Sequence, residues 1–200
     1  MEGLVWALRH HGPGKAAINM LGSPSLSSEG RHPSANTVRK FRLCCVSSFF
    51  YIDARFLSAI QLARVSGFSP IITTSSLLHS DYLKSLGATY VLDRSLSAVE
   101  LQRRIRDILG SSTMDYALDA IGHGGTTAIS LHSLSPSGYL ASVQGGSGRI
   151  QDGRTIINIY GSVHTPQNRD FGKQYILGIA ALMESGDIKV GVPFARIAQD

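Results

Sequence analysis

The stretch that decides the fold is Ala54-Arg-Phe-Leu-Ser-Ala-Ile-Gln-Leu-Ala-Arg-Val-Ser66, followed at once by Gly67-Phe-Ser-Pro-Ile-Ile-Thr73. Its first half predicts a helix, because Phe56, Ile60 and Ala63 recur at helical spacing and Gly67 is a typical helix stop. Its second half, from Ser69 to Thr73, is short, apolar and β-branched, which is typical of a buried strand. A helix joined to a strand by so short a turn indicates a βαβ unit, so we expect a parallel sheet.

The same alternation continues on both sides of this stretch. Strands are expected at residues 41–46, 69–73, 89–92, 114–118, 138–143 and 155–163. Helices are expected at residues 54–66, 80–86, 97–109, 125–134 and 171–185. Six strands with right-handed crossovers predict an α/β fold, a doubly wound parallel sheet of the Rossmann-like type with strand order 3-2-1-4-5-6.

Two of the expected helices carry apolar residues at helical spacing. In the helix at 97–109 the residues expected to face inward are Val99, Leu101, Ile105 and Ile108, and the arginines expected to face solvent are Arg103, Arg104 and Arg106. In the helix at 171–185 the recurring residues are Ile176, Ile179, Ala180 and Met183. The arginines are most simply a solvated face.

Composition bounds the class of protein. The 200 residues are 43% hydrophobic and 16% charged, which is typical of a folded globular chain. No apolar run approaches the length of a membrane span, and the basic residues form no recognised nucleic-acid motif, so neither a membrane nor a nucleic acid is an expected partner. The adjacent Cys44 and Cys45 suit neither a disulfide framework nor a zinc site. We expect a cytoplasmic protein without a metal.

The chain divides into three parts of different composition. Residues 1–37 are rich in Gly, Ser, Pro and His and are expected to form an irregular, poorly structured arm. Residues 38–189 are expected to form the Rossmann-like domain, which would be incomplete. Residues 190–200 have no expected partner element and are interpreted as a truncated tail.

In a sheet of this kind the ligand crevice lies at the carboxyl ends of the strands. After the second strand come Thr74, Ser75 and Ser76, with no Asp or Glu before Asp81. Small hydroxyl side chains with a nearby cation suit the 2′-phosphate of NADP(H), whereas an acidic residue at this point would indicate NAD. Arg94, just after the third strand, is the candidate cation. Alternatively, these hydroxyls serve only as turn and helix-capping residues.

Two further loops are candidates. Leu118-Asp-Ala-Ile-Gly122 follows the fourth strand, and its small residue and glycine would let a cofactor ribose approach the backbone. The glycine would equally serve a turn and a helix start. Ser142-Val-Gln-Gly-Gly-Ser-Gly148 follows the fifth strand and is either a loop on the nicotinamide side or a plain mobile connection.

One expected feature is missing. A dinucleotide-binding fold uses glycines between its first strand and first helix, so that backbone N–H groups at the helix N-terminus hold the pyrophosphate. Here residues 47–58 read Ser-Ser-Phe-Phe-Tyr-Ile-Asp-Ala-Arg-Phe-Leu-Ser, without any glycine. Bulky rings and Asp53 stand where phosphates would bind.

Three segments carry a resemblance to a known family: Ser58-Ala-Ile-Gln-Leu-Ala-Arg-Val-Ser-Gly-Phe68, Tyr82-Leu-Lys-Ser-Leu-Gly-Ala88 and Asp115-Tyr-Ala-Leu-Asp-Ala-Ile-Gly122. Together they resemble the medium-chain dehydrogenase/reductase family, in particular its zinc-free fungal branch of trans-acting enoyl reductases and quinone-oxidoreductase-like proteins. The likeness covers roughly residues 58–189. Members pair this cofactor domain with a GroES-like catalytic domain, of which residues 1–37 would be only a remnant.

The resemblance implies an NADP(H)-dependent oxidoreductase that transfers hydride to an enoyl, quinone or related carbonyl substrate, with secondary metabolism as its setting. It places Thr74, Ser75, Ser76 and Arg94 near the adenosine 2′-phosphate, and Ala120, Ile121 and Gly122 along the cofactor. It identifies no catalytic residue. The missing glycine loop leaves an alternative, a catalytically inactive Rossmann-like fragment that binds a nucleotide or a partner subunit. The last strand, at an expected sheet edge, suggests homodimer pairing.

Overall fold

The computed structural model describes residues 43–46, 54–122, 125–144, 148–150, 152–158, 166 and 169–189. Within these residues strands and helices alternate as expected. The strands are β1 (Leu43–Val46), β2 (Ile71–Ser75), β3 (Tyr90–Asp93), β4 (Met114–Asp119), β5 (Leu134–Ser142), β6 (Gly148–Arg149) and β7 (Thr155–Asn158). The helices are α3 (Ala54–Val65), the 3₁₀ helix η1 (Leu77–His79), α4 (Ser80–Leu86), α5 (Ala98–Leu109), α6 (Thr126–Ser133) and α7 (Arg169–Glu184). The expected arm at 1–37 and tail at 190–200 lie outside the described residues.

The strands form one sheet in the order β3-β2-β1-β4-β5-β7-β6. The pairs from β3 to β7 are parallel, and β6 runs antiparallel to β7. The predicted order of six strands is therefore confirmed. The prediction that the last strand forms the sheet edge is wrong, because β6 pairs with Thr155 and Ile156 on its outer side.

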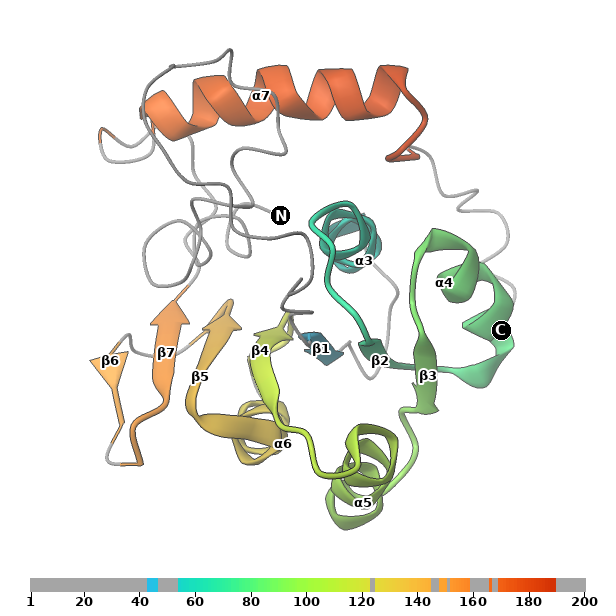
Figure 1. The fold of residues 1–200 in the computed structure, drawn as a ribbon, viewed down its shortest axis with the longest axis vertical. Coiled ribbons are helices and arrows are strands. Elements are labelled where there is room, and N and C mark those ends of the chain that lie inside the picture. The colour runs from blue at the N-terminus through green and yellow to red at the C-terminus, as the bar shows by residue number, and fades with distance from the viewer. Residues whose placement is uncertain are drawn as a thin grey trace, which may run out of the picture.

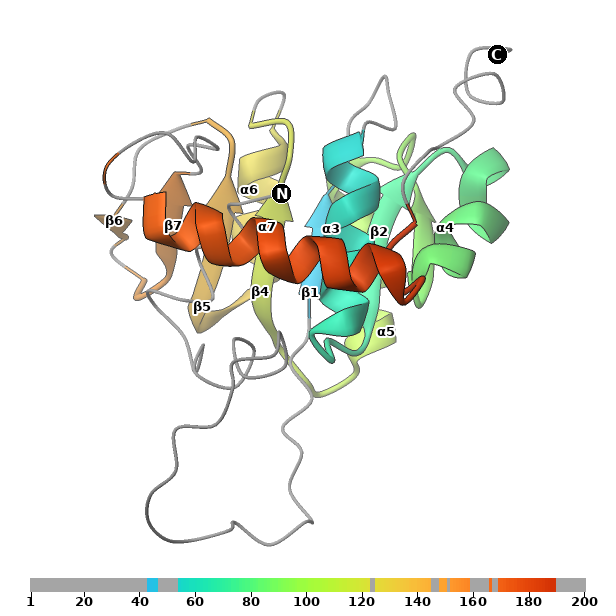
Figure 2. The ribbon, with the colours of Figure 1, turned by 90° about the horizontal axis from the view of Figure 1, so that it is seen from above.

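Helices cover both faces of the sheet (Figure 1). α3 and α4 lie on one face together with α7, which crosses over the strands farther from the sheet than α3 (Figure 2), whereas α5 and α6 lie on the other face. Each face buries its own apolar cluster. The first, under α3 and α4, includes Phe56, Ile60 and Leu83; the second, under α5 and α6, includes Ile72, Ile105 and Leu140. The fold is therefore a three-layer α/β sandwich.

Helix α5 confirms most of its predicted faces. Leu101 and Ile105 are buried and the three arginines are exposed, but Val99 is 75% exposed, so its predicted inward orientation is wrong. The reason is geometric: two residues span about 200° of a helix, so Val99 and Leu101 face opposite ways. The helix begins at a capping residue, Ser97, whose hydroxyl accepts a hydrogen bond from the backbone N–H of Glu100 at 3.2 Å.

Strand β5 begins at Leu134, four residues before the predicted start at Gly138. The turn-like sequence Ser135-Pro-Ser-Gly138 favours a loop, yet the structure carries it within the strand. The register shifts there: Met114 pairs with Leu134, whereas Tyr116 pairs with Tyr139. Three extra residues are accommodated as a bulge, where proline and glycine are tolerated in a strand.

Helix α7 keeps the predicted apolar spacing but buries little of it. Ile176 is 59% exposed and Met183 is 42% exposed, and Ala180 is also exposed. The end of the helix is nevertheless tied to α3. The buried side chain of Gln61 accepts a hydrogen bond from the backbone N–H of Lys189 at 2.7 Å and donates to its carbonyl at 3.4 Å.

Candidate functional site

The first group of predicted site residues lies at the carboxyl ends of β2 and β3. Thr74 and Ser75 are buried in β2 and, as successive strand residues, point to opposite faces of the sheet. Ser76 and Arg94 are half-buried in the turns that follow the two strands. The backbone N–H of Arg94 donates to the carbonyl oxygen of Ser75 at 3.0 Å, so the two turns lie side by side. The structure thus brings Ser75, Ser76 and Arg94 together.

The capping interpretation of these hydroxyls finds no support at Ser76. This residue occupies the N-cap position of η1, but its side chain makes no capping hydrogen bond. Its hydroxyl is thus not committed to that helix, unlike the hydroxyl of Ser97 in α5. Ser76 thus keeps a half-buried hydroxyl at the end of β2, in the turn beside that of Arg94.

One carboxylate lies close to this group, that of Asp93, whose residue pairs with Ser75 across the strands. It accepts hydrogen bonds from the backbone N–H of Ser95 at 2.9 Å and from the Ser95 hydroxyl at 2.8 Å. These bonds, chiefly the backbone one, and to a lesser extent the charge of Arg94 hold the pKa of Asp93 below its usual range. Asp93 is the last residue of β3, and its carboxylate is bonded within the turn that follows that strand.

The second group of predicted site residues, Ala120, Ile121 and Gly122, is half-buried in the loop between β4 and α6. The loop is organised by Asp119, the last residue of β4, which is fully buried. One oxygen of its carboxylate, Oδ1, accepts from the N–H of Ile121 at 3.0 Å and from the N–H of Gly122 at 2.9 Å. The loop is folded back around this side chain.

Two threonines at the start of α6 complete the surroundings of the Asp119 carboxylate. The hydroxyl of Thr126 lies 3.0 Å from each carboxylate oxygen, and the hydroxyl of Thr127 donates to Oδ2 at 2.7 Å. Among the described residues no lysine, arginine or histidine forms an ion pair with it. Hydrogen bonds from neutral donors therefore stabilise the buried side chain, with help from the helix N-terminus.

The loop after β5 lies against this second group. The backbone N–H of Val143 donates to the carbonyl oxygen of Asp119 at 3.2 Å. A Cβ atom added to Gly122, whose φ is +74°, would lie 2.4 Å from the Cβ of Gln144. The glycine is therefore required by a close approach of Gln144 and by its left-handed backbone. The sequence suggested that this glycine lets a cofactor ribose approach the backbone. The structure supplies a second reason, the close approach of Gln144.

The two groups of residues flank the same point of the sheet. Strand β1 lies between β2 and β4, and the strand order reverses there, which is where ligands bind in open α/β sheets. The glycine-free loop at 47–53 and the glycines at 145 and 146 lie outside the described residues, so the missing phosphate loop remains a sequence observation.

Asp119 was not selected as a site residue from the sequence, although it lies in the loop quoted there. A signal was present. A carboxylate at the last position of an apolar strand, three residues before a glycine and seven before a Thr-Thr pair that starts a helix, can satisfy several donors locally. The contact between Gly122 and Gln144 had no comparable signal, because it joins two loops 22 residues apart.

A doubly wound parallel sheet with helices on both faces defines a Rossmann-like α/β fold. No group of three metal-ligating side chains occurs among the described residues. Nor does any described helix have the length and apolarity to cross a membrane.

A family model described as zinc-binding dehydrogenase matches residues 57–163, more than half of the chain. The chain therefore belongs to the medium-chain dehydrogenase/reductase family. At the level of sequence alone, no curated protein matches the chain.

Several solved structures share the fold. A mycobacterial protein solved with NADPH is 24% identical, with a TM-score of 0.59 over 80% of this chain and 50% of its own. The Escherichia coli quinone oxidoreductase solved with NADPH is 20% identical, with a TM-score of 0.58 over 78% of this chain and 49% of its own. The CurK enoyl reductase is 18% identical, with a TM-score of 0.59 over 76% of this chain and 46% of its own. The chain spans about half the length of these structures.

Proposed function

We propose that this chain binds NADP(H) and acts as the cofactor domain of an oxidoreductase that reduces an enoyl, quinone or related carbonyl substrate. The observation that carries the proposal is the meeting of Ser75, Ser76 and Arg94 at the ends of β2 and β3. No acidic residue follows β2 before Asp81, so the carboxylate that would indicate NAD is missing after β2, and the nearby Asp93 carboxylate is bonded to Ser95. Family membership and the folds of NADPH-bound oxidoreductases support it.

Each part of the site has a role in this proposal. Arg94 and Ser76 bind the 2′-phosphate over β2 and β3. The loop Ala120–Gly122 borders the rest of the cofactor over β4. The bound cofactor supplies the hydride, so the protein's task is binding, orientation and exclusion of water. No side chain among the described residues is assigned to proton transfer.

The cofactor preference is tested with an arginine variant. Titration with NADPH and NADH, followed by reduced-nicotinamide fluorescence, gives both dissociation constants. We expect Arg94→Gln to weaken NADPH binding about tenfold or more and to leave NADH unchanged, because a charge-assisted contact contributes roughly 1.5–3 kcal/mol. Arg106→Gln, which removes an exposed arginine of α5, is the matched control. Equal affinity of the wild-type chain for NADPH and NADH would argue against the proposal.

The alternative is a Rossmann-like fragment that binds a nucleotide or a partner subunit without turnover. The observation in its favour is the sequence of residues 47–58, which has no glycine where a dinucleotide-binding fold places its phosphate loop. Oxidation of NADPH at 340 nm with a quinone or an enoyl thioester separates the two. Binding with turnover supports the reductase, and binding without turnover on either acceptor supports the fragment.

Two finer points remain proposals. A homodimer formed at this side of the sheet pairs along β6, the outermost strand, and sedimentation of the purified chain tests it. The cytoplasm is the proposed location and secondary metabolism the proposed setting, and fractionation of the native cells with detection of the chain tests the location.

A further inference from the structure

Two register partners in the middle of the sheet share an unusual environment. Asp119 ends β4, Ser142 ends β5, and the two residues pair across the parallel strands. Both are fully buried polar residues at the last position of their strands. Each side chain is bound to the loop that follows its own strand. Buried polar groups cost free energy unless they are hydrogen-bonded, so such a pair has a specific structural consequence.

Each member of the pair fixes the backbone of its loop. Asp119 accepts from the N–H groups of Ile121 and Gly122. The hydroxyl of Ser142 donates to the carbonyl oxygen of Gln144 at 2.7 Å and lies 3.3 Å from its N–H. Side chains that bind the backbone two or three residues ahead hold it in a defined turn. The loop conformations are therefore set before any ligand arrives.

The two loops are also joined to each other. The backbone N–H of Val143 donates to the carbonyl oxygen of Asp119, and Gly122 lies against the Cβ and Cγ atoms of Gln144. Residues 119–122 and 142–144 thus form one unit at the carboxyl edge of β4 and β5, which we name the two-loop platform.

The platform has a definite chemical character. A pyrophosphate needs N–H donors, but the N–H groups of Ile121 and Gly122 already point at the Asp119 carboxylate. That same negative charge opposes a phosphate nearby. The platform therefore suits the phosphate-free nicotinamide end of a dinucleotide, with its ribose hydroxyls and carboxamide, and not its phosphates.

We infer that Asp119 and Ser142 are positioning residues, which preset the two-loop platform for the nicotinamide end of the cofactor while leaving the adenosine end unaffected. The inference rests on the proposed binding of NADP(H). Since the 2′-phosphate group lies over β2 and β3, a fragment that carries only the adenosine end, 2′,5′-ADP, does not reach the platform. The two ligands together distinguish positioning from general stability.

The experiment compares four variants with the wild-type chain, using NADPH fluorescence and calorimetry with 2′,5′-ADP. We expect Asp119→Ala to weaken NADPH at least tenfold and 2′,5′-ADP less than twofold. Ser142→Ala, a smaller change, should weaken NADPH about threefold with the same selectivity. Asp119→Asn keeps one acceptor oxygen for both N–H groups and should stay within about threefold of wild type. Ile105→Ala, which destabilises the distant α5 core, is the control and should change neither constant.

Amide hydrogen exchange provides a readout that needs no cofactor. The amides of Ile121, Gly122 and Val143 should be protected in the wild-type chain and in Asp119→Asn, and should lose protection in Asp119→Ala. If Asp119→Ala does not fold, Ser142→Ala carries the same comparison through the amide of Gln144.

The outcomes separate the two proposals. A wild-type chain that binds neither ligand overturns the proposed function, and the inference with it. If Asp119→Ala and Ser142→Ala bind NADPH as tightly as the wild-type chain does, the inference alone is overturned. Equal weakening of NADPH binding and 2′,5′-ADP binding also overturns the inference, because it indicates a loss of general stability. An Asp119→Asn variant that binds NADPH as weakly as Asp119→Ala overturns it too, because that result indicates a role for the charge.

Discussion

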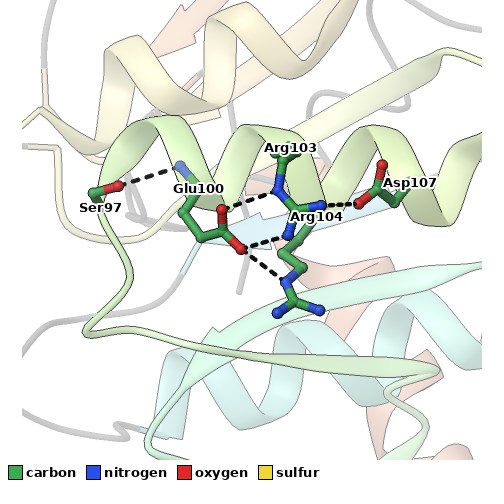
Figure 3. Close-up of polar contacts among 5 residues, drawn as sticks. All are labelled: Ser97, Glu100, Arg103, Arg104 and Asp107. Atoms are coloured by element: carbon green, nitrogen blue, oxygen red, sulfur yellow. Dashed lines mark hydrogen bonds and ion pairs between the residues drawn. The ribbon is translucent and has the colours of Figure 1, made fainter.

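Two carboxylates in this domain each accept several hydrogen bonds, yet their surroundings differ. Asp119 is fully buried and receives its bonds from backbone N–H groups and threonine hydroxyls. Glu100 lies on the surface of α5, where Arg103 binds both of its oxygens and Arg104 binds one (Figure 3). Asp119 therefore determines the shape of a loop, whereas Glu100 adds to a solvated helix face.

The difference follows from solvent. Water competes for every bond that Glu100 makes, and long arginine side chains lose rotamer freedom when they are held in place. Loss of the Asp119 side chain leaves several donors without a partner in a place that water does not reach. The number of contacts is similar, but the cost of removing them is not.

The largest effect is expected from Asp119→Ala, as a loss of stability that accompanies its loss of cofactor affinity. The variant leaves the donors of Ile121, Gly122 and Thr127 without their acceptor. We expect the free energy of unfolding to fall by about 3 kcal/mol, from the usual cost of unsatisfied buried groups. Urea denaturation measures it, and Asp119→Asn should recover more than half. A loss no greater than that of Glu100→Gln would contradict the comparison.

The next effect is expected from Gly122→Ala, which perturbs the platform from the other side. The backbone there has φ of +74°, and the new Cβ would meet the Cβ of Gln144 at 2.4 Å. Gly67, with φ of +78° and no atom within 4 Å of an added Cβ, is the matched control. Gly67→Ala should cost about 1–2 kcal/mol, from backbone strain alone. Gly122→Ala should cost a further ~1–3 kcal/mol for overpacking.

A double variant separates the two causes. Adding Gln144→Gly to Gly122→Ala removes the clash with the side chain and leaves the strain. The stability of the pair should then lie near that of Gly67→Ala, after correction for Gln144→Gly alone. Equal losses for Gly67→Ala and Gly122→Ala would show that the loop relaxes away from Gln144.

Whether a contact is local or distant along the chain explains which features of the fold the sequence predicts. Helix α4 and the inner arginine-free face of α5 follow from local periodicity, and the strand order follows from the handedness of crossovers. Two predictions about the sheet went wrong, one where a local pattern misleads and one where there is no pattern to read. Ser135-Pro-Ser-Gly138 resembles a turn, but pairing with β4 keeps it in the sheet as a bulge. Strand β6 is only two residues long and carries no periodic signal.

For the site, the sequence predicts where the candidate residues lie in the fold, but it does not predict which side chains shape the loops. Thr74, Ser75, Ser76 and Arg94 lie at strand ends, as parallel topology requires, and their role in binding stays a prediction. The role of Asp119 depends on donors from a loop and a helix together. The pairing of Asp119 with Ser142 depends on register, which the sequence does not state.

The smallest effect is expected from Glu100→Gln, which sharpens the comparison from the exposed side. Its bonds to Arg103, and less strongly to Arg104, lower the pKa of Glu100 from 4.5 to about 2. Because the pKa of Glu100 is lower in the folded state, its bonds stabilise the fold at pH values above the unfolded-state pKa. This stabilisation disappears as the pH falls through the folded-state pKa. Any difference in melting temperature between Glu100→Gln and wild type should thus appear above pH 4.5, shrink in 1 M salt and vanish below about pH 2. Since water competes for these bonds at the surface of α5, we expect that difference to be close to the error of the measurement, with Asp107→Asn on the same helix as the control. A salt-independent loss as large as that of Asp119→Ala would show that exposure does not separate the two carboxylates, and that the arginines of α5 hold more of the fold than their solvated positions allow.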